Sequence, residues 1–228
     1  MSSENLVTRG NAKLGPDVYL TNLPAVSGCD WRTFLCSLGC YANRGRSRPL
    51  QSRYGRNLEI LQTDPRGYER TLVREISELR PRVFRFHVSG ELQSVRHARM
   101  VLRIVRRFPE TRFFLYTRSW KDSRILEELR RVDSEPNAFV WFSTDASETV
   151  PLPSGRIARI FADEESLRSA GYAYCPEQSG RRESCSDCQL CWTAKPNAKL
   201  GFVVHSVPNE IRETFSRLEK GSSDESSS

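Results

Sequence analysis

Apolar and polar residues alternate with a period of two along residues 83–89, which predicts a β-strand. The two faces of this strand are predicted to carry Phe84, Phe86 and Val88 on one side and Arg85, His87 and Ser89 on the other. In an open antiparallel sheet the polar row would be the solvent-exposed side. The flanking segments have helical periodicity, however, and a strand between helices is typical of a parallel sheet covered on its outer face. We therefore expect the polar row to face an internal chamber.

Further apolar segments have the length and composition of strands, and amphipathic helical patterns separate most of them. These segments are residues 18–21, 113–118, 139–145, 158–162 and 202–205. Helical periodicity is clearest over residues 95–106, where apolar side chains occupy one face and arginines the other. Another helix is predicted to begin at Asp64-Pro65, a cap followed by a first-turn proline, and to end before Pro81. This order of elements predicts an α/β fold with a mainly parallel sheet.

Polar residues gather where the predicted strands end. The three clusters are Ser89-Gly90-Glu91, Thr117-Arg118 and Ser143-Thr144-Asp145. In barrels and in open α/β sheets, ligands bind at the carboxyl ends of the parallel strands. A glycine at such a position lets the backbone approach a ligand, and the following Glu91 could hold an amino group or a ribose. The sequence therefore predicts a ligand site at this edge.

The remaining segments suggest one domain with flanking regions. We expect a flexible lead-in over residues 1–16, a single α/β domain over residues 17–220 and a disordered, serine-rich acidic tail over residues 221–228. A basic polar loop is expected over residues 43–56, and a cysteine-rich loop over residues 172–196.

Charge and hydropathy add two constraints. The formal net charge of +7 and the pI near 9.2 come mostly from arginine, which favours bidentate contacts with phosphate. Nucleic acid or a nucleotide is therefore a candidate partner, although solvated helix surfaces account for the same arginines. No apolar run reaches the roughly 18 residues of a membrane span, and the N-terminus has no targeting pattern. We expect a cytoplasmic protein without a membrane partner.

Four of the seven cysteines lie close together near the end of the chain. Cys175, Cys185, Cys188 and Cys191 have the spacing C-x9-C-x2-C-x2-C. Clustered cysteines in a reducing compartment indicate a metal rather than disulfides. Two successive two-residue gaps are typical of a cubane iron–sulfur cluster, whereas zinc sites more often have two separated C-x2-C pairs. We expect a [4Fe–4S] cluster here, with zinc as the alternative metal.

The other three cysteines follow the first predicted strand. Cys29, Cys36 and Cys40 have the spacing C-x6-C-x3-C. Three ligands without a fourth would leave one iron of a cluster open to a small molecule, and that iron would face the Ser89-Gly90-Glu91 turn if the first two predicted strands are parallel neighbours. Alternatively, the three thiols bind zinc together with His87 or another ligand.

These motifs resemble two known families. A three-cysteine loop after the first strand, a Gly-Glu turn after the second and about six strands are similar to radical S-adenosylmethionine enzymes. The resemblance to a phage family called gene product 88 is closer and covers most of residues 11–206. Its motifs are Cys-Tyr-Ala at 40–42, Phe-His-Val-Ser-Gly-Glu at 86–91, Tyr-Thr-Arg-Ser-Trp at 116–120, the later cysteines and Val-His at 204–205.

The resemblance implies a fold and a set of cofactor ligands. The fold would be a partial (β/α)6 barrel of the TIM type, with the cysteine-rich metal-binding loop before the last strand. Cys29, Cys36 and Cys40 would hold a [4Fe–4S] cluster, and Cys175, Cys185, Cys188 and Cys191 a second, auxiliary one. Ser89, Gly90 and Glu91 would position S-adenosylmethionine.

The resemblance also implies an enzymatic function. The residues expected to line the substrate chamber are Arg85, His87, Tyr116, Arg118, Asp145 and His205. With electrons from a reductant such as flavodoxin or ferredoxin, the enzyme would cleave S-adenosylmethionine and abstract hydrogen from an unknown substrate. The cofactor supplies the difficult chemistry, and the protein orients it and excludes water.

A second interpretation needs no catalysis. The chain would then be a zinc-stapled, arginine-rich module that binds nucleic acid through its basic loop and helices. The aromatic residues that could stack on bases are Trp31, Tyr41, Tyr54 and Trp120. The polar strand face argues against it, because a simple binding module has no need of Arg85, His87 and Ser89 inside its sheet.

Overall fold

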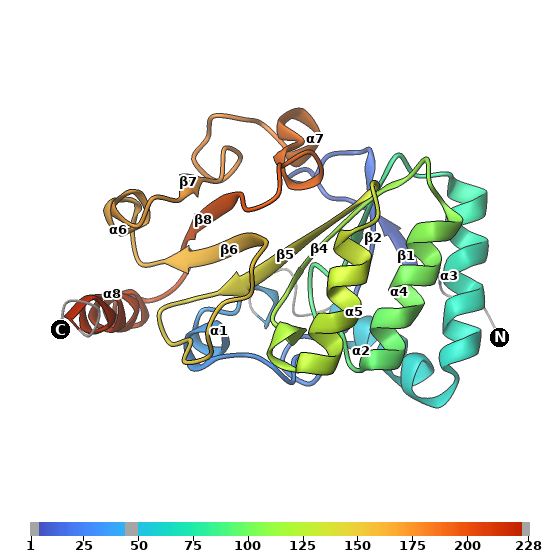
Figure 1. Ribbon diagram of the computed structural model, residues 1–228, viewed down its shortest axis with the longest axis horizontal. Coiled ribbons are helices and arrows are strands. Elements are labelled where there is room, and N and C mark those ends of the chain that lie inside the picture. Colours follow the sequence, from blue (N-terminus) through green and yellow to red (C-terminus); the bar gives the residue numbers. More distant parts are fainter. Residues whose placement is uncertain (1–4, 44–49, 225–228) are drawn as a thin grey trace.

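The computed structural model describes residues 5–43 and 50–224. Within them, one sheet contains eight strands in the order β1-β2-β3-β4-β5-β6-β8-β7 (Figure 1). All neighbours pair in parallel except β1, which is antiparallel to β2. The strands are β1 (Val7–Arg9), β2 (Val18–Thr21), β3 (Val83–Phe86), β4 (Arg112–Thr117), β5 (Ala138–Thr144), β6 (Arg156–Phe161), β7 (Ala173–Tyr174) and β8 (Lys199–Val203).

Eight α-helices are present in the same part of the chain, together with short 3-10 turns. The helices are α1 (Phe34–Leu38), α2 (Gln51–Thr63), α3 (Pro65–Leu79), α4 (Val95–Arg107), α5 (Ser123–Asp133), α6 (Glu164–Ser169), α7 (Cys185–Cys188) and α8 (Asn209–Asp224). The 3-10 turns that matter below are η1 (Tyr41–Asn43), η3 (Ser119–Lys121) and η4 (Leu190–Trp192). None of the described helices has the length and apolar character needed to cross a membrane.

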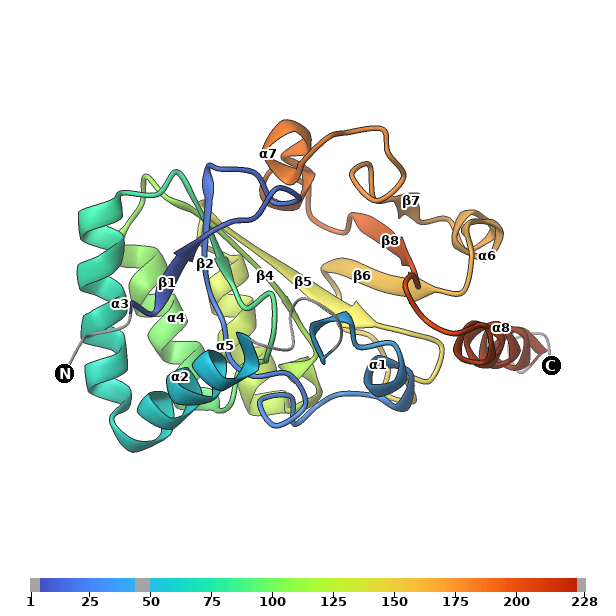
Figure 2. The same ribbon diagram turned by 180° about the vertical axis from the view of Figure 1, so that it is seen from behind.

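Local sequence explains where the long helices begin. The Asp64 carboxylate caps α3 by accepting a hydrogen bond of 2.8 Å from the backbone of Gly67, and Pro65 occupies the first turn. Ser94 caps α4 in the same way, and α4 buries its apolar face. Figure 1 shows α4 and α5 covering one face of the sheet, while Figure 2 shows α1 near the carboxyl ends of the strands and α7 near their amino ends.

The two faces of the sheet carry different cores. The helix-covered face is apolar and includes Phe84, Phe86 and Phe113. The opposite face, called the inner face below, carries Val18, Val83 and Phe114 under Trp192 of η4. The predicted α/β class and the mainly parallel sheet are therefore confirmed. Strands β2, β3, β4, β5, β6 and β8 also follow one another in chain order, but closure into a partial barrel and metal binding by the cysteine-rich loop stay predictions.

The predicted alternation along residues 83–89 holds only as far as Phe86. His87 has a φ of +60°, and its backbone leaves the strand there. Its ring lies 5.2 Å from that of His97 on α4, whereas Val88 packs with the inner-face cluster. The expectation that His87 lines the inner chamber beside Arg85 was therefore wrong, because a left-handed residue reverses the order of the faces.

Three predicted segment boundaries were also wrong. Residues 5–16 are not a loose lead-in, since Val7–Arg9 form an edge strand and the Val7 backbone donates a hydrogen bond of 2.8 Å to Glu75. The basic loop 43–56 becomes helical from Gln51, while residues 44–49 lie outside the described chain. In the predicted disordered tail 221–228, α8 continues to Asp224, and residues 225–228 lie outside the described chain.

Candidate functional site

The loop that carries Cys29, Cys36 and Cys40 lies across the carboxyl ends of the strands. The Gly28 carbonyl oxygen accepts a hydrogen bond of 2.8 Å from the Glu91 backbone, just beyond β3. The Thr33 hydroxyl donates a hydrogen bond of 2.5 Å to Asp145 at the end of β5. Both contacts hold the cysteine loop at the edge where parallel α/β sheets bind ligands.

The three thiols of this loop, called the amino-terminal cysteine group below, are partly buried and affect one another electrostatically. Burial raises the pKa of Cys29 to about 12, and the charges of Glu91, Cys36 and Cys40 add to that rise. Burial also raises the pKa of Cys36, against the opposing positive charge of Arg118. The predicted proximity of this group to the Glu91 turn is therefore present in the structure.

Glu91 is buried and ties the ends of β3 and β4 together. Its carboxylate accepts hydrogen bonds of 2.6 Å from the Thr117 hydroxyl, 2.9 Å from the Arg118 backbone and 3.3 Å from the Ser119 hydroxyl. Burial raises the pKa of Glu91 in spite of these donors. The carboxylate thus already has partners within the protein, whereas the buried Ser89 hydroxyl has none among the described residues.

Gly90 is required by the chain itself. Its φ is +84°, and a Cβ atom at this position would lie 2.4 Å from the Cβ of Leu23. The close approach that glycine permits is therefore between the turn after β3 and the segment after β2. This approach brings the turn against the start of the cysteine loop.

An ion-pair network continues along the same edge. The Arg118 guanidinium is 2.8 Å from Asp145 and 3.9 Å from Glu148, and Lys121 is 2.8 Å from Glu148. Burial would raise the pKa of Asp145, but Arg118 and the hydrogen bonds from Ser147 and Thr33 lower it below its ordinary value. The network fixes Asp145 as a carboxylate that orients the cysteine loop.

The inner face holds Arg85 and Tyr116, as expected. The Arg85 guanidinium lies 5.1 Å from the centre of the Tyr116 ring and 5.5 Å from that of Phe114. In the described part of the chain no acceptor bonds the buried Arg85 Nε. Within residues 5–43 and 50–224 no carboxylate forms an ion pair with Arg85, so this cation can interact with an added negative charge.

The second group of cysteines, called the carboxyl-terminal cysteine group below, lies against the inner face. The Tyr116 hydroxyl donates a hydrogen bond of 2.8 Å to the Cys191 sulfur, and the Trp141 indole donates one of 2.9 Å to the Cys191 carbonyl oxygen. Burial raises the pKa of Cys191 to about 12, opposed by the Tyr116 hydrogen bond, with additional influence from Cys185 and Cys175. Cys188 lies at the end of α7, one turn after Cys185.

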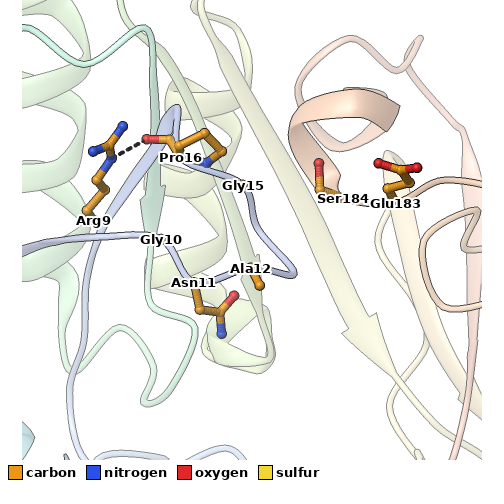
Figure 3. A pocket seen from close by; sticks show the side chains of 8 residues that line it. All are labelled: Arg9, Gly10, Asn11, Ala12, Gly15, Pro16, Glu183 and Ser184. Carbon is orange, nitrogen blue, oxygen red and sulfur yellow. Dashed lines mark hydrogen bonds between the residues drawn. The ribbon is translucent and has the colours of Figure 1, made fainter.

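Residues before β2 support this second loop. The backbones of Cys185 and Ser186 donate hydrogen bonds of 2.9 and 3.1 Å to the carbonyl oxygens of Lys13 and Leu14. A pocket of about 510 Å³ lies beside this contact. Figure 3 shows its lining residues, which come from the β1–β2 connection and the segment before α7. It is lined mainly by small side chains and backbone, and neither cysteine group lines it.

The last predicted chamber residue lies elsewhere. His205 follows β8 and is exposed, with its Nδ1 atom 3.2 Å from the Ser206 hydroxyl. Sequence reasoning missed two residues that position the amino-terminal group, Thr33 and Glu148. Thr33 could have been found as a helix cap, because it stands three residues before Cys36 and accepts a hydrogen bond from its backbone. Glu148 has no comparable local signal.

The donor chemistry of both groups suits a metal. All seven cysteines are free thiols, and thiolates are the ligands of iron–sulfur clusters and of structural zinc. The described residues contain no group of three or more cysteine, histidine or acidic side chains close enough together to hold a metal ion. Metal binding would therefore require the thiols of each group to turn toward a common centre.

Comparison with known families gives one match. The model of the family described as gene product 88 matches residues 5–194, which is most of the chain. No curated protein and no solved structure matches the chain. The matched range includes all seven cysteines and strands β1 to β7.

Proposed function

Since the chain belongs to the gene product 88 family, a phage-type family, we propose that it is an iron–sulfur protein that works as a radical S-adenosylmethionine-like enzyme. The observation that carries this proposal is the position of the amino-terminal cysteine group. Hydrogen bonds at Gly28 and Thr33 hold its loop over the carboxyl ends of β3 and β5. A cluster bound by these three thiols would keep one iron open, next to the turn that follows the strand carrying Arg85.

Each group of residues has a role in this proposal. Cys29, Cys36 and Cys40 would hold a [4Fe–4S] cluster, and the carboxyl-terminal group an auxiliary cluster. When bound, the first cluster supplies the electron for reductive cleavage of S-adenosylmethionine. The unpartnered Ser89 hydroxyl is available to the cofactor, while Glu91 holds the turn in place through its three hydrogen bonds.

The substrate would bind on the inner face. Arg85 and Tyr116 lie there, and the Arg118–Asp145 pair closes the edge toward the cysteine loop. Arg85 has no carboxylate partner among the residues that the structure describes, and such a guanidinium favours a substrate that carries an anionic group, such as a nucleotide. A flavodoxin or ferredoxin would be the reductant. His87 and His205 have no place in this substrate site, because the first contacts His97 and the second is exposed.

The nucleic-acid-binding alternative receives less support. On the helical layer, Arg99, Arg103 and Arg106 pair with glutamates on neighbouring elements at 2.7–2.9 Å. These arginines are therefore already neutralised by the protein. Trp120 is only 2 % exposed, so it cannot stack on bases.

Metal content decides between the two functions. Protein purified without oxygen should be brown and contain about eight irons with matching sulfide, because two cubane clusters hold four irons each. The triple variant Cys29→Ala, Cys36→Ala, Cys40→Ala should retain about four. The matching variant with Cys185→Ala, Cys188→Ala and Cys191→Ala should lose the other four. Iron-dependent cleavage of S-adenosylmethionine should disappear in the first variant. Colourless protein with zinc would contradict the proposal and favour the binding module.

A further inference from the structure

Arg85 is a cation that no residue in the described part of the chain binds. It lies on β3 directly beside Phe114 of β4, and both side chains belong to the inner face. Among the described residues, neither a hydrogen bond nor an ion pair joins its guanidinium to another group, although its Nε atom is buried. A buried donor without an acceptor costs free energy, so such a group in a folded protein indicates a bound water, ion or ligand.

The surroundings of Arg85 decide which partner suits it. The rings of Tyr116 and Phe114 lie 5.1 and 5.5 Å from the centre of its guanidinium. Aromatic faces attract a cation without accepting ordinary hydrogen bonds, so they leave the N–H groups of the guanidinium available. These N–H groups form a planar fork that matches two oxygens of a single phosphate.

Tyr41 holds an aromatic ring at the carboxyl end of the same strand. Its hydroxyl donates a hydrogen bond of 2.6 Å to the carbonyl oxygen of Val88, a residue that packs with the inner-face cluster. Burial of this hydroxyl raises the pKa of Tyr41, and the largest opposing influence is the positive charge of Arg85. The Tyr41 side chain is nevertheless 51 % exposed. A partly exposed ring, held in place by its hydroxyl, offers a surface on which a base can stack.

The second cation near Tyr41 already has an anionic partner. The charge of Lys13 also acts on the Tyr41 hydroxyl, but its ammonium group lies 2.8 Å from the Glu177 carboxylate. Of these two cations, Arg85 alone lacks an anionic partner among the described residues. Ser89, which follows Val88, adds a buried hydroxyl that also has no partner there. The free groups at this place are therefore one cation, one hydroxyl and one aromatic ring.

We propose that Arg85 and Tyr41 form a two-point binding site for a nucleoside monophosphate, in which Arg85 holds the phosphate and Tyr41 stacks on the base. This inference deepens the proposed function and rests on it for the catalytic use of the site, because it names the substrate class that the inner face receives. The Ser89 hydroxyl supplies a further hydrogen bond to the ligand. None of these contacts uses a cysteine, so nucleotide binding does not depend on a metal.

Isothermal titration calorimetry of the full-length protein with matched ligands tests the site. Adenosine 5′-monophosphate should bind. Ribose 5-phosphate lacks the base and adenosine lacks the phosphate, and each should bind at least about tenfold more weakly. Arg85→Gln should weaken binding of the nucleotide by about tenfold or more and leave adenosine binding unchanged. Tyr41→Leu should weaken nucleotide binding by about tenfold and leave ribose 5-phosphate binding unchanged.

Three further variants sharpen the measurement. Tyr41→Phe keeps the ring and should retain most of the affinity for the nucleotide. Phe34→Leu removes a ring that is 61 % exposed on α1, in the same cysteine-bearing loop, and should leave all affinities unchanged. Arg85→Lys keeps the charge but not the planar fork, so it should weaken nucleotide binding and leave adenosine binding unchanged. It decides the role of Arg85 if Arg85→Gln does not fold.

Iron and sulfide content, measured on the same preparations, separates this inference from the function on which it rests. Iron–sulfur protein whose nucleotide affinity stays the same in the Arg85 variants and in Tyr41→Leu would overturn the inference and leave the function standing, as would iron–sulfur protein that does not bind the nucleotide. Equal affinities for the nucleotide and ribose 5-phosphate would also overturn the two-point site. Colourless protein with the predicted ligand selectivity would overturn the radical mechanism and support the nucleotide site.

Discussion

The two cysteine-bearing loops are held to the same sheet by different physical means. Polar contacts fix the amino-terminal loop: Thr33 binds Asp145, and Asp145 binds the buried Arg118. Aromatic packing fixes the carboxyl-terminal loop, in which Trp192 is 3 % exposed and lies 5.2 Å from the Phe114 ring. By contrast, Phe34 on α1 is 61 % exposed.

The two loops therefore differ in how much each contributes to the stability of the fold and in how each is positioned on the sheet. Burial of apolar area is the main favourable term in folding, so the carboxyl-terminal loop contributes to the core. A buried ion-pair network recovers little more than its own desolvation cost, but removal of one member leaves the others buried and unpaired. The amino-terminal loop combines these directional contacts with one apolar anchor, the buried Leu35 of α1, which packs in a cluster with Phe215.

Replacement of Trp192 should have the largest effect on stability. Trp192→Ala removes a buried indole between the cysteine-rich loop and the inner face, and we expect the free energy of unfolding to fall by about 3–5 kcal/mol. Urea denaturation monitored by circular dichroism measures this free energy of unfolding. Phe34→Ala is the matched aromatic control in the other loop and should change stability by less than about 0.5 kcal/mol. Equal losses in the two variants would remove the contrast between the loops.

Replacement of Arg118 should come next. Arg118→Met keeps the apolar stem but leaves the buried Asp145 without its cation and removes a positive charge near Glu91, while Lys121 still pairs with Glu148. We expect a loss of about 3 kcal/mol in the same measurement. Arg103→Met breaks a bidentate pair with Glu69 on the helix surface and should cost less than about 1 kcal/mol. A loss for Arg118→Met no greater than that of the control would show that the network does not hold the edge.

Much of the sheet could be predicted because strand-like and helical patterns are present in six of the seven parallel strands and in most of the helices between them. The edge strand Val7–Arg9 could not, since three residues carry too little pattern and its support comes from Glu75, far along the chain. Helix α2 as a whole was missed, because no side chain caps its start and the arginines near that start were interpreted as part of a basic loop. At His87, a single positive φ turns the side chain to the helix-covered face of the sheet. The alternation of apolar and polar residues along the strand gives no sign of such a backbone conformation.

For the candidate site, the sequence predicted which residues gather at the edge of the sheet, but not which residues they bind. Cysteine spacing and polar strand ends indicated two thiol groups and a ligand edge. The hydrogen bond from Tyr116 to Cys191 joins residues 75 positions apart, and that from Thr33 to Asp145 joins residues 112 positions apart. Such contacts depend on the tertiary fold, so they decide roles that a motif alone leaves open.

The pH dependence of stability offers a smaller effect at the same edge. Although burial acts to raise it, the pKa of Asp145 is lowered in the folded protein by Arg118, Ser147 and Thr33. Its stabilising contribution is therefore complete above the unfolded value of about 3.9 and is lost as pH falls through the lower folded value. The difference in unfolding free energy between wild type and Asp145→Asn should stay constant from about pH 7 to 5 and shrink below about pH 4. A difference that grows on acidification would contradict the ion pair.

The smallest effect should come from Tyr41, which follows the last cysteine of the amino-terminal group. Its ring is half exposed, and its hydroxyl donates a hydrogen bond of 2.6 Å to the Val88 carbonyl oxygen, just before the Ser89-Gly90-Glu91 turn. Tyr41→Phe should lower the free energy of unfolding by about 1 kcal/mol, the usual net value of one hydrogen bond. Hydrogen exchange should show faster opening of residues 40–43 and 88–91 and no change around Cys191. Faster exchange at both cysteine groups would mean that the two loops open together, and that polar and aromatic anchoring are not independent.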